Sequence, residues 1–303
     1  MTKIDINETI IKAERASLNV FSVGDPLSRP IILVHGLRDS AKSLLAVASR
    51  LAQKYHVVLP ELRGHGRSQQ FVSYSMPDFL GDLYKVIEQF TDGSCALFGH
   101  SLGGHISSKY AALFPEQIKS LILVEGLGPP SQDNLSELEE IKAYRNNLLA
   151  RQINAAKPAK QMPTIEDATK RLISNNPRLP ENKAKKIAKF LTTNSEDALA
   201  WNFDPRANGV FIGTSYRENE KFWRHSKCPT CIVSGALSYE YWDKEMSAYN
   251  RPSHFQTGEM EARVAQFPDA EHHWFEMSGH MVHYDEPDRL ASVCETFLEK
   301  KYE

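Results

Sequence analysis

The stretch ALFGHSLGGH, residues 96–105, places a serine between two glycines directly after an apolar run. Gly99, Ser101 and Gly103 match the pattern G-x-S-x-G at the junction of an expected strand and an expected helix. A tight, strained turn at this junction would lift the Ser101 hydroxyl above the carboxyl end of a sheet, and bulky side chains at the two glycine positions would clash there. Ser101 is therefore the candidate nucleophile. Because a serine hydroxyl is a weak nucleophile at neutral pH, the rest of the chain must supply a base, an acid and an oxyanion hole.

Apolar runs and amphipathic segments alternate on both sides of this stretch. The alternation predicts right-handed strand–helix–strand crossovers and a mostly parallel central sheet with flanking helices, which is an α/β fold. The expected strands lie within residues 10–24, 30–36, 56–66, 95–101 and 118–126, and the expected helices within residues 40–55, 75–90 and 101–115.

Residues 128–225 differ from the rest of the chain, because they are polar and rich in helical patterns, with little that resembles a buried strand. The strand–helix alternation resumes at residues 228–235, with a strand at 272–279 and a closing helix at 286–302. We therefore expect one α/β core that is interrupted by an inserted helical cap. The expected division is core residues 1–127, cap residues 128–225 and core residues 226–303.

The composition is that of an ordinary soluble globular protein. The chain has 303 residues, 41% of them hydrophobic and 24% charged, with a formal net charge of −2, so neither a nucleic acid nor an anionic membrane is an expected partner. The N-terminus does not resemble a signal peptide and no apolar run approaches the roughly 18 residues of a membrane span, which predicts a cytoplasmic protein. Four cysteines are too few for a disulfide scaffold, and we interpret Cys228 and Cys231 as two thiols at a strand entry rather than as a metal or redox site.

The candidate base is one of eleven histidines. His280, in the sequence SGHMVH, directly follows the last expected strand, so it would lie at the same carboxyl edge of the sheet as Ser101. His283 is the near alternative. The other candidates suit the role less well, because they lie within or before a strand or flank the serine turn, where structural roles are expected: His100, His105, His272 and His273.

Two backbone N–H groups are candidates for the oxyanion hole. The helix after Ser101 begins at once, so the N–H of Leu102 and the positive end of the helix dipole face the developing oxyanion. The second donor is expected from the loop after the strand at residues 30–36, where the N–H of Leu37 is the candidate. His35, in the same loop, is expected to brace it rather than to react.

The chain resembles the α/β-hydrolase family in five motifs, which occur here in the family's order and spacing: LVHGLRDS, ELRGHGRS, GHSLGG, LILVEG and SGHMVH. It is similar to the epoxide-hydrolase and haloalkane-dehalogenase-like branch, whose members carry a helical cap. The resemblance implies a serine hydrolase with Ser101 as nucleophile, His280 as base, and Leu37 and Leu102 as oxyanion donors. Epoxide hydrolases and dehalogenases attack with an aspartate, and Leu102 stands where dehalogenases carry a halide-holding tryptophan, so these two activities are not expected. A serine fits acyl transfer instead.

The catalytic acid departs from the family pattern. Family members usually carry an aspartate in a G-x-x-D arrangement past the seventh strand, but here Gly235 is followed at that distance by Ser238, which cannot supply a negative charge. Some dehalogenase-like relatives place their acid after the sixth strand. Glu125, at the end of LILVEG, has that position and is the favoured acid, and the chain order Ser101, Glu125, His280 permits it. The alternatives are Glu240 and Asp243.

Together these residues predict a cap-bearing serine hydrolase that resembles carboxylesterases and cleaves a carboxylic ester through an acyl-enzyme. The cap favours a small or medium, largely apolar substrate. We expect this small-molecule ester or acyl compound as the partner, with no metal or organic cofactor, and leave a homodimer open. A thioesterase or a carbon–carbon bond hydrolase would use the same triad, and a non-catalytic ligand-binding protein on this fold is a further alternative.

Overall fold

The computed structural model describes residues 5–13, 16–131, 136–155, 161–195, 198–211, 216–246 and 253–302. Within these residues, eight strands form the central sheet: β1 (Ile6–Ala13), β2 (Ala16–Val23), β3 (Pro30–Val34), β4 (His56–Pro60), β5 (Cys95–His100), β6 (Ile118–Val124), β10 (Thr230–Gly235) and β11 (Ala270–Phe275). Their spatial order is β1-β2-β4-β3-β5-β6-β10-β11. The β1–β2 and β2–β4 pairs are antiparallel, and every pair from β4 to β11 is parallel. The prediction of a mostly parallel sheet is confirmed.

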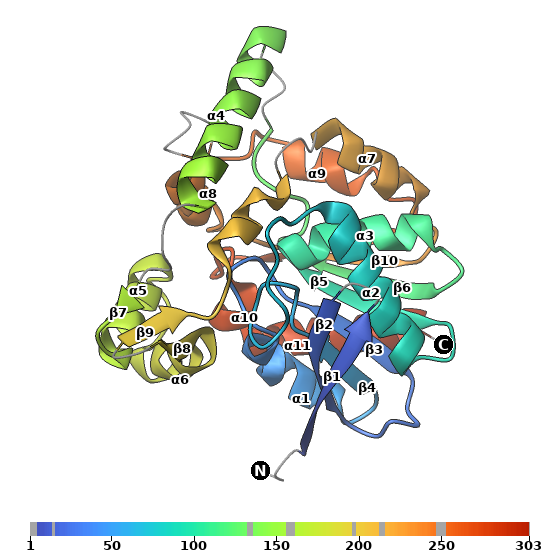
Figure 1. Ribbon diagram of the computed structural model, residues 1–303. Helices are drawn as coiled ribbons and strands as arrows, with labels where there is room; N and C mark the ends of the chain where they lie inside the picture. The colour runs from blue at the N-terminus through green and yellow to red at the C-terminus, as the bar shows by residue number, and fades with distance from the viewer. Residues whose placement is uncertain are drawn as a thin grey trace.

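Helices cover both faces of this sheet (Figure 1): α2 (Met76–Phe90) and α3 (Leu102–Leu113) on one face, α1 (Leu45–Leu51) and α11 (Pro287–Lys301) on the other. Successive side chains of a strand point to opposite faces, and every residue of β5 is buried. Leu97 packs in the cluster that contains α2 and α3, whereas Phe98 packs in the cluster that contains α1 and α11. A short continuous apolar run therefore forms a central strand here, because helices bury it from both sides.

The parallel strands bring their carboxyl ends to one edge of the sheet. Ser101 follows β5, Glu125 follows β6, Leu37 lies after β3 and His280 lies after β11. In parallel α/β sheets ligands bind at this edge. The topology thus assembles residues that are far apart in the sequence on one side of the molecule.

The chain leaves the sheet between β6 and β10. The described elements of this insertion are α4 (Glu137–Ala155), β7 (Gln161–Met162), α5 (Ile165–Asn175), α6 (Glu181–Leu191), β8 (Thr192–Ser195), β9 (Ala198–Trp201), the 3-10 helix η2 (Pro205–Phe211) and α7 (Tyr216–His225). Helices α5 and α6 pack with β7 and β9 around an apolar cluster that also takes in Tyr284 from the C-terminal part of the chain. In Figure 1, α4 projects away from the sheet. No described helix is long and apolar enough to cross a membrane.

The small sheet β7-β9-β8 is a feature that was not expected from the sequence, which predicted only helices in this segment. The strands TTNS and ALAW have four residues each, too few to show a two-residue alternation as a pattern. Antiparallel pairing with β7 and β8 holds β9 in place instead. Part of the segment 128–225 lies outside the described residues.

Candidate active site

Ser101 occupies the turn between β5 and α3. Its backbone has φ 51° and ψ −116°, a strained conformation for a residue with a side chain. The flanking glycines are required by close backbone contacts, because a Cβ at Gly99 would lie 2.3 Å from the carbonyl oxygen of Gly103, and a Cβ at Gly103 would lie 2.1 Å from that of Val34. The Ser101 N–H donates to the carbonyl oxygen of Val124 at 3.0 Å. These contacts hold the Ser101 side chain at the carboxyl edge of the sheet.

Ser101, His280 and Glu125 form a continuous chain of hydrogen bonds. His280 Nε2 lies 3.0 Å from Ser101 Oγ, and His280 Nδ1 lies 3.0 Å from Glu125 Oε2. The side chains of His280 and Glu125 are only 3% and 6% exposed. With Glu125 ionised, His280 Nδ1 carries the proton and donates it, which leaves Nε2 to accept the Ser101 hydroxyl. A general base that activates a serine needs this tautomer.

Glu125 is held by the ends of two neighbouring strands. It follows β6 at φ 51°, and its N–H donates to the carbonyl oxygen of Val233 in β10 at 2.9 Å. Its Oε1 accepts the N–H of Gly235 at 2.7 Å, while Oε2 faces His280. Both oxygens of this nearly buried carboxylate therefore have donors, which offsets the cost of burying its charge.

Comparison with known proteins identifies the family to which this fold belongs. The profile of the family described as alpha/beta hydrolase fold matches residues 29–287. The chain belongs to the α/β-hydrolase family. Among curated proteins, this α/β hydrolase is similar to a serine hydrolase-like protein of Mus musculus, with 23% identity over 286 residues that cover 91% of this chain and 90% of the relative. It is also similar to the sn-1-specific diacylglycerol lipase ABHD11 of Danio rerio, with 25% identity over 90% of this chain and 79% of the relative.

A solved structure extends the comparison to the whole fold. A thioesterase domain from the curacin biosynthetic pathway matches this α/β hydrolase with a TM-score of 0.77 and 25% sequence identity. The match covers 95% of this chain and 99% of that domain. The α/β-hydrolase fold predicted from the sequence motifs is confirmed.

Neither Ser238, at the family's usual acid position, nor the alternative acids Glu240 and Asp243 takes the place of Glu125 beside His280. Ser238 Oγ donates to the carbonyl oxygen of Gly235 at 2.8 Å and is buried before α8 (Tyr239–Met246). The Glu240 carboxylate forms an ion pair with Arg178 at 2.7 Å, and Asp243 is exposed on α8. Within the described residues, the carboxylate bonded to His280 is that of Glu125.

The histidines near Ser101 in the sequence have supporting contacts. His100 Nε2 donates to the backbone carbonyl of His280 at 2.9 Å, so it anchors the loop that carries the candidate base. Burial lowers the pKa of His105 to about 3, which keeps this ring neutral, and its edge packs against Phe211. The remaining alternatives have partners of their own: His272 bonds Ser234, His273 bonds Glu271 and His283 bonds Asp39.

The loop after β3 passes directly beside the candidate nucleophile. A Cβ at Gly36 would lie 3.2 Å from Ser101 Cβ, and Leu37 is the next residue. On the other side, α3 begins at Leu102. In the part of the chain that the structure describes, neither the Leu37 N–H nor the Leu102 N–H donates to another protein group. Both amides are therefore available to an oxyanion.

Buried side chains brace this loop. His35 Nε2 accepts the N–H of Leu62 at 3.0 Å, a bracing contact of the kind expected from its position. Asp39 was missed at the sequence level; its carboxylate lies 3.0 Å from His283 Nε2 and accepts the Tyr284 hydroxyl at 2.7 Å. Burial alone would raise the pKa of Asp39, but the hydrogen bond and charge of His283 hold it well below its ordinary value. No sequence pattern pairs Asp39 with His283, because they lie in segments 244 residues apart.

Two groups of described residues place metal-ligand atoms within 4.8 Å of one another: Asp39, His100 and His283 in one, and Cys231, Glu271 and His273 in the other. In the first group Asp39 is already bonded to His283 and Tyr284. In the second, Glu271 is bonded to His273. Neither group includes Ser101, Glu125 or His280.

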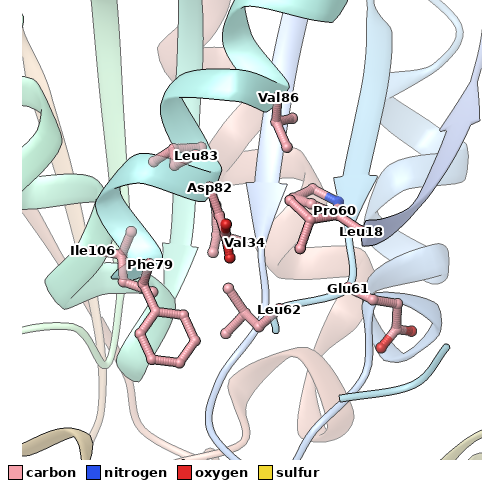
Figure 2. Close-up of a pocket in the computed structure, with 10 residues that line it drawn as sticks. All are labelled: Leu18, Val34, Pro60, Glu61, Leu62, Phe79, Asp82, Leu83, Val86 and Ile106. Carbon is pink, nitrogen blue, oxygen red and sulfur yellow. The ribbon is translucent and has the colours of Figure 1, made fainter. Parts of the chain in front are cut away.

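Figure 2 shows a small cavity between α2 and the sheet, with space for about one water molecule. Most of its lining is apolar, and its two carboxylates have partners: Asp82 accepts two hydrogen bonds from Arg63 at 2.7 Å each, and Glu61 accepts one from Ser40 at 2.7 Å. Ser101 does not line it. The cavity is a packing void of the core rather than a substrate site.

Proposed function

We propose that this α/β hydrolase is a serine esterase that cleaves a carboxylic ester of a small or medium, largely apolar substrate through an acyl-enzyme. The observation that carries the proposal is the hydrogen-bond chain from Ser101 through His280 to Glu125, with 3.0 Å at each step. Two relatives support the proposal, because one is named a serine hydrolase-like protein and the other a diacylglycerol lipase.

Acylation begins when Ser101 Oγ attacks the ester carbonyl carbon and His280 Nε2 takes the hydroxyl proton. Glu125 stays ionised, orients the imidazole and stabilises the imidazolium. The carbonyl electrons move to the oxygen, and the N–H groups of Leu37 and Leu102 bind the resulting oxyanion, aided by the dipole of α3. The tetrahedral species then collapses, the bond to the leaving oxygen breaks, and His280 gives its proton to the departing alcohol.

Deacylation repeats these steps with water as the nucleophile. His280 Nε2 takes a proton from water, and the oxygen attacks the acyl carbon of the Ser101 ester. When the tetrahedral species collapses, the proton returns to Ser101 Oγ and the carboxylic acid leaves. Glu125 and the two backbone amides act in this half-reaction as they do in the first.

The segment between β6 and β10 is proposed to cap this site. Arg178, between α5 and α6, forms ion pairs with Glu240 at 2.7 Å and with Asp285 at 3.2 Å. Asp285 also accepts the N–H of Gly279 at 2.8 Å, one residue before His280. The insertion is therefore tied to the loop that carries the base, and a cap in this position would exclude water and limit substrate size. The proposed division stays core residues 1–127, cap residues 128–225 and core residues 226–303.

Labelling with a fluorophosphonate tests the role of Ser101 without knowledge of the substrate. The wild-type protein should gain one phosphonyl group by intact mass, and Ser101→Ala should gain none, because the activated hydroxyl is absent. Ser292→Ala, whose hydroxyl bonds the Asp288 carbonyl on α11, is the control and should label like wild type. A folded wild-type protein that binds short-chain esters without labelling or turnover would contradict the proposal and favour a non-catalytic binding protein.

Thioester hydrolysis is the second candidate, and the match to the curacin thioesterase domain favours it. Esters and thioesters use the same triad, so only the leaving group separates the two activities. An oxygen ester and a thioester with the same acyl chain should therefore be compared by kcat/KM. We expect the oxygen ester to be the better substrate, and a thioester preferred by tenfold or more would shift the assignment.

A further inference from the structure

The imidazole of His280 lies against two aromatic rings. Neither ring takes part in the hydrogen-bond chain from Ser101 through His280 to Glu125. The ring of Tyr241 is stacked on the imidazole, with centroids 4.0 Å apart and an angle of 11° between the planes. Trp242 meets the same imidazole edge-on, with centroids 5.2 Å apart at 67°. Both aromatic residues come from α8, the helix that begins directly after Ser238. The part of the chain where the family usually carries its acid therefore presents an aromatic face to the base.

A stacked aromatic face affects the two charge states of an imidazole differently. The negative face of the ring quadrupole attracts a cation, whereas a neutral ring gains less. In the proposed reaction, His280 becomes a cation when it takes the Ser101 proton. A contact that is stronger in that state lowers the barrier rather than merely strengthening binding.

We propose that Tyr241 is a positioning residue for the reaction, which stacks on His280, holds its plane between Ser101 and Glu125, and stabilises its protonated form. The inference rests on the proposed function, since it assigns to His280 the role of base. Tyr241 acts through His280 and does not itself touch the reacting atoms.

Helix α8 is fixed in place by ion pairs near both of its ends. Near its start, Glu240 pairs with Arg178 from the insertion at 2.7 Å. Near its end, Glu245 accepts two hydrogen bonds at 2.9 Å from Arg38, the residue after Leu37 in the loop beside Ser101. Burial, followed by the charge of Glu245, raises the pKa of Tyr241 to about 12. The phenol therefore stays neutral near neutral pH. Tyr241 contacts His280 through the face of its ring and exchanges no proton with it.

Other titratable groups surround His280 on several elements. Burial lowers the pKa of both His100 on β5 and His105 on α3 far enough to keep them neutral, so neither opposes the imidazolium with charge. Arg178 passes beside Gly279 but is paired with two carboxylates. The polar and titratable groups around His280 are Ser101 and His100 from the β5 end, His105 from α3, Glu125 after β6, Tyr241 from α8, Arg178 from the insertion, and the Asp39–His283 pair behind His100.

The test is the pH dependence of fluorophosphonate labelling at Ser101 in matched variants. Tyr241→Phe keeps the ring face, and Tyr241→Leu keeps apolar bulk without it. We expect Tyr241→Phe to match wild type within about twofold. Tyr241→Leu should label about 3- to 30-fold more slowly, and the midpoint of its acid limb should fall by about 0.5 to 1 pH unit, because the lost stack destabilises the imidazolium.

The control is Tyr239→Leu on the same helix, because the ring of Tyr239 stacks on His254 and not on His280. This variant should keep the wild-type labelling rate and the wild-type midpoint of the acid limb. The direction of the midpoint separates stacking from packing. If Tyr241 acted only by keeping water away, its loss would hydrate His280 and raise the midpoint, since burial disfavours the charged imidazole. An unchanged or raised midpoint in Tyr241→Leu would therefore overturn the proposal, as would equal losses in Tyr241→Phe and Tyr241→Leu.

Ring fluorination at position 241 and NMR titration of His280 test the same contact by other means. If Tyr241→Leu does not fold, phenylalanines of increasing ring fluorination at position 241 keep the shape and weaken the negative ring face, and the midpoint should fall stepwise along that series. If folded wild type neither labels nor turns over esters, the proposed function fails, but NMR titration of His280 in the same variants still reports the stack. A lower His280 midpoint in Tyr241→Leu would then support the contact, and an unchanged one would contradict it.

Discussion

At the scale of single residues, the carboxylate of Glu125 divides its two oxygens between two donors. Oε1 accepts the backbone N–H of Gly235 at 2.7 Å, and Oε2 faces His280 Nδ1 at 3.0 Å. An amide of the same shape has only one acceptor oxygen. Whichever way it turned, it would set an NH₂ group against one of these donors. The arrangement therefore demands a carboxylate, for its acceptor count as well as for its charge.

Glu125→Gln should lower kcat for ester hydrolysis by on the order of 10³- to 10⁴-fold, because an amide that faces His280 favours the wrong tautomer and removes the charge that stabilises the imidazolium. Steady-state hydrolysis of a p-nitrophenyl ester, with a thermal melt to verify folding, measures the effect. Asp243→Asn, on the exposed surface of α8, is the matched control and should keep wild-type kcat. A loss of less than tenfold in Glu125→Gln would send the search for the acid elsewhere.

At the scale of elements, the junction of β5 and α3 depends on close approach between backbones. A Cβ at Gly103 would lie 2.1 Å from the carbonyl oxygen of Val34 in β3, closer than any side-chain carbon packs. The obstacle is backbone of the central sheet, which has no freedom to move aside. The absence of a side chain at Gly103 therefore allows the start of α3 to lie directly on the end of β3.

Gly103→Ala should lower the free energy of unfolding by about 2–4 kcal/mol and slow the labelling of Ser101, because α3 must shift away from the sheet. Gly81→Ala is the matched control in the interior of α2, where a Cβ would meet nothing within 4 Å. It should instead raise the free energy of unfolding by about 0.5–1 kcal/mol, since alanine is the better helix former. Urea denaturation of both variants decides the matter, and equal stability for the two would contradict the packing argument.

At the scale of the whole molecule, several histidines are buried as neutral rings. Burial lowers the pKa of His65 and of His105 to about 3, and that of His100 well below its ordinary value. In the unfolded chain each of these groups takes up a proton near pH 6.5. Between pH 6.5 and about 3 these side chains thus bind more protons in the unfolded state than in the folded state. These histidines therefore lower the free energy of unfolding as the pH is lowered through this window.

His105→Phe should flatten this acid dependence by about 1.4 kcal/mol per pH unit below pH 6.5, because one protonation of the unfolded state is removed. Urea denaturation at pH 7.5, about 6 and about 5 measures the slope. His225→Gln, at an exposed position at the end of α7, is the control and should keep the wild-type slope. Identical slopes for His105→Phe and wild type would show that His105 is not held neutral in the folded protein.

How far the site could be predicted differs from residue to residue. The serine turn was visible because Gly99, Ser101 and Gly103 encode it within five positions, between an apolar run and a helical pattern. His280 was placed at the correct edge because it follows a strand. Glu125 was favoured over Glu240 and Asp243 because of the family resemblance and because it follows the strand next to that of Ser101. No sequence pattern indicated that Tyr241 stacks on His280.

The sequence by itself determined the class of fold and the position of the serine turn, because the periods of strands and helices and the steric needs of a tight turn are local properties of the chain. Only the tertiary structure decided which carboxylate meets His280, since that contact joins residues 155 positions apart. It also decided the small sheet β7-β9-β8, the bracing of the loop after β3 by Asp39, and the aromatic face of α8. Each depends on how distant segments lie against one another, and a contact across the fold leaves no period in the sequence.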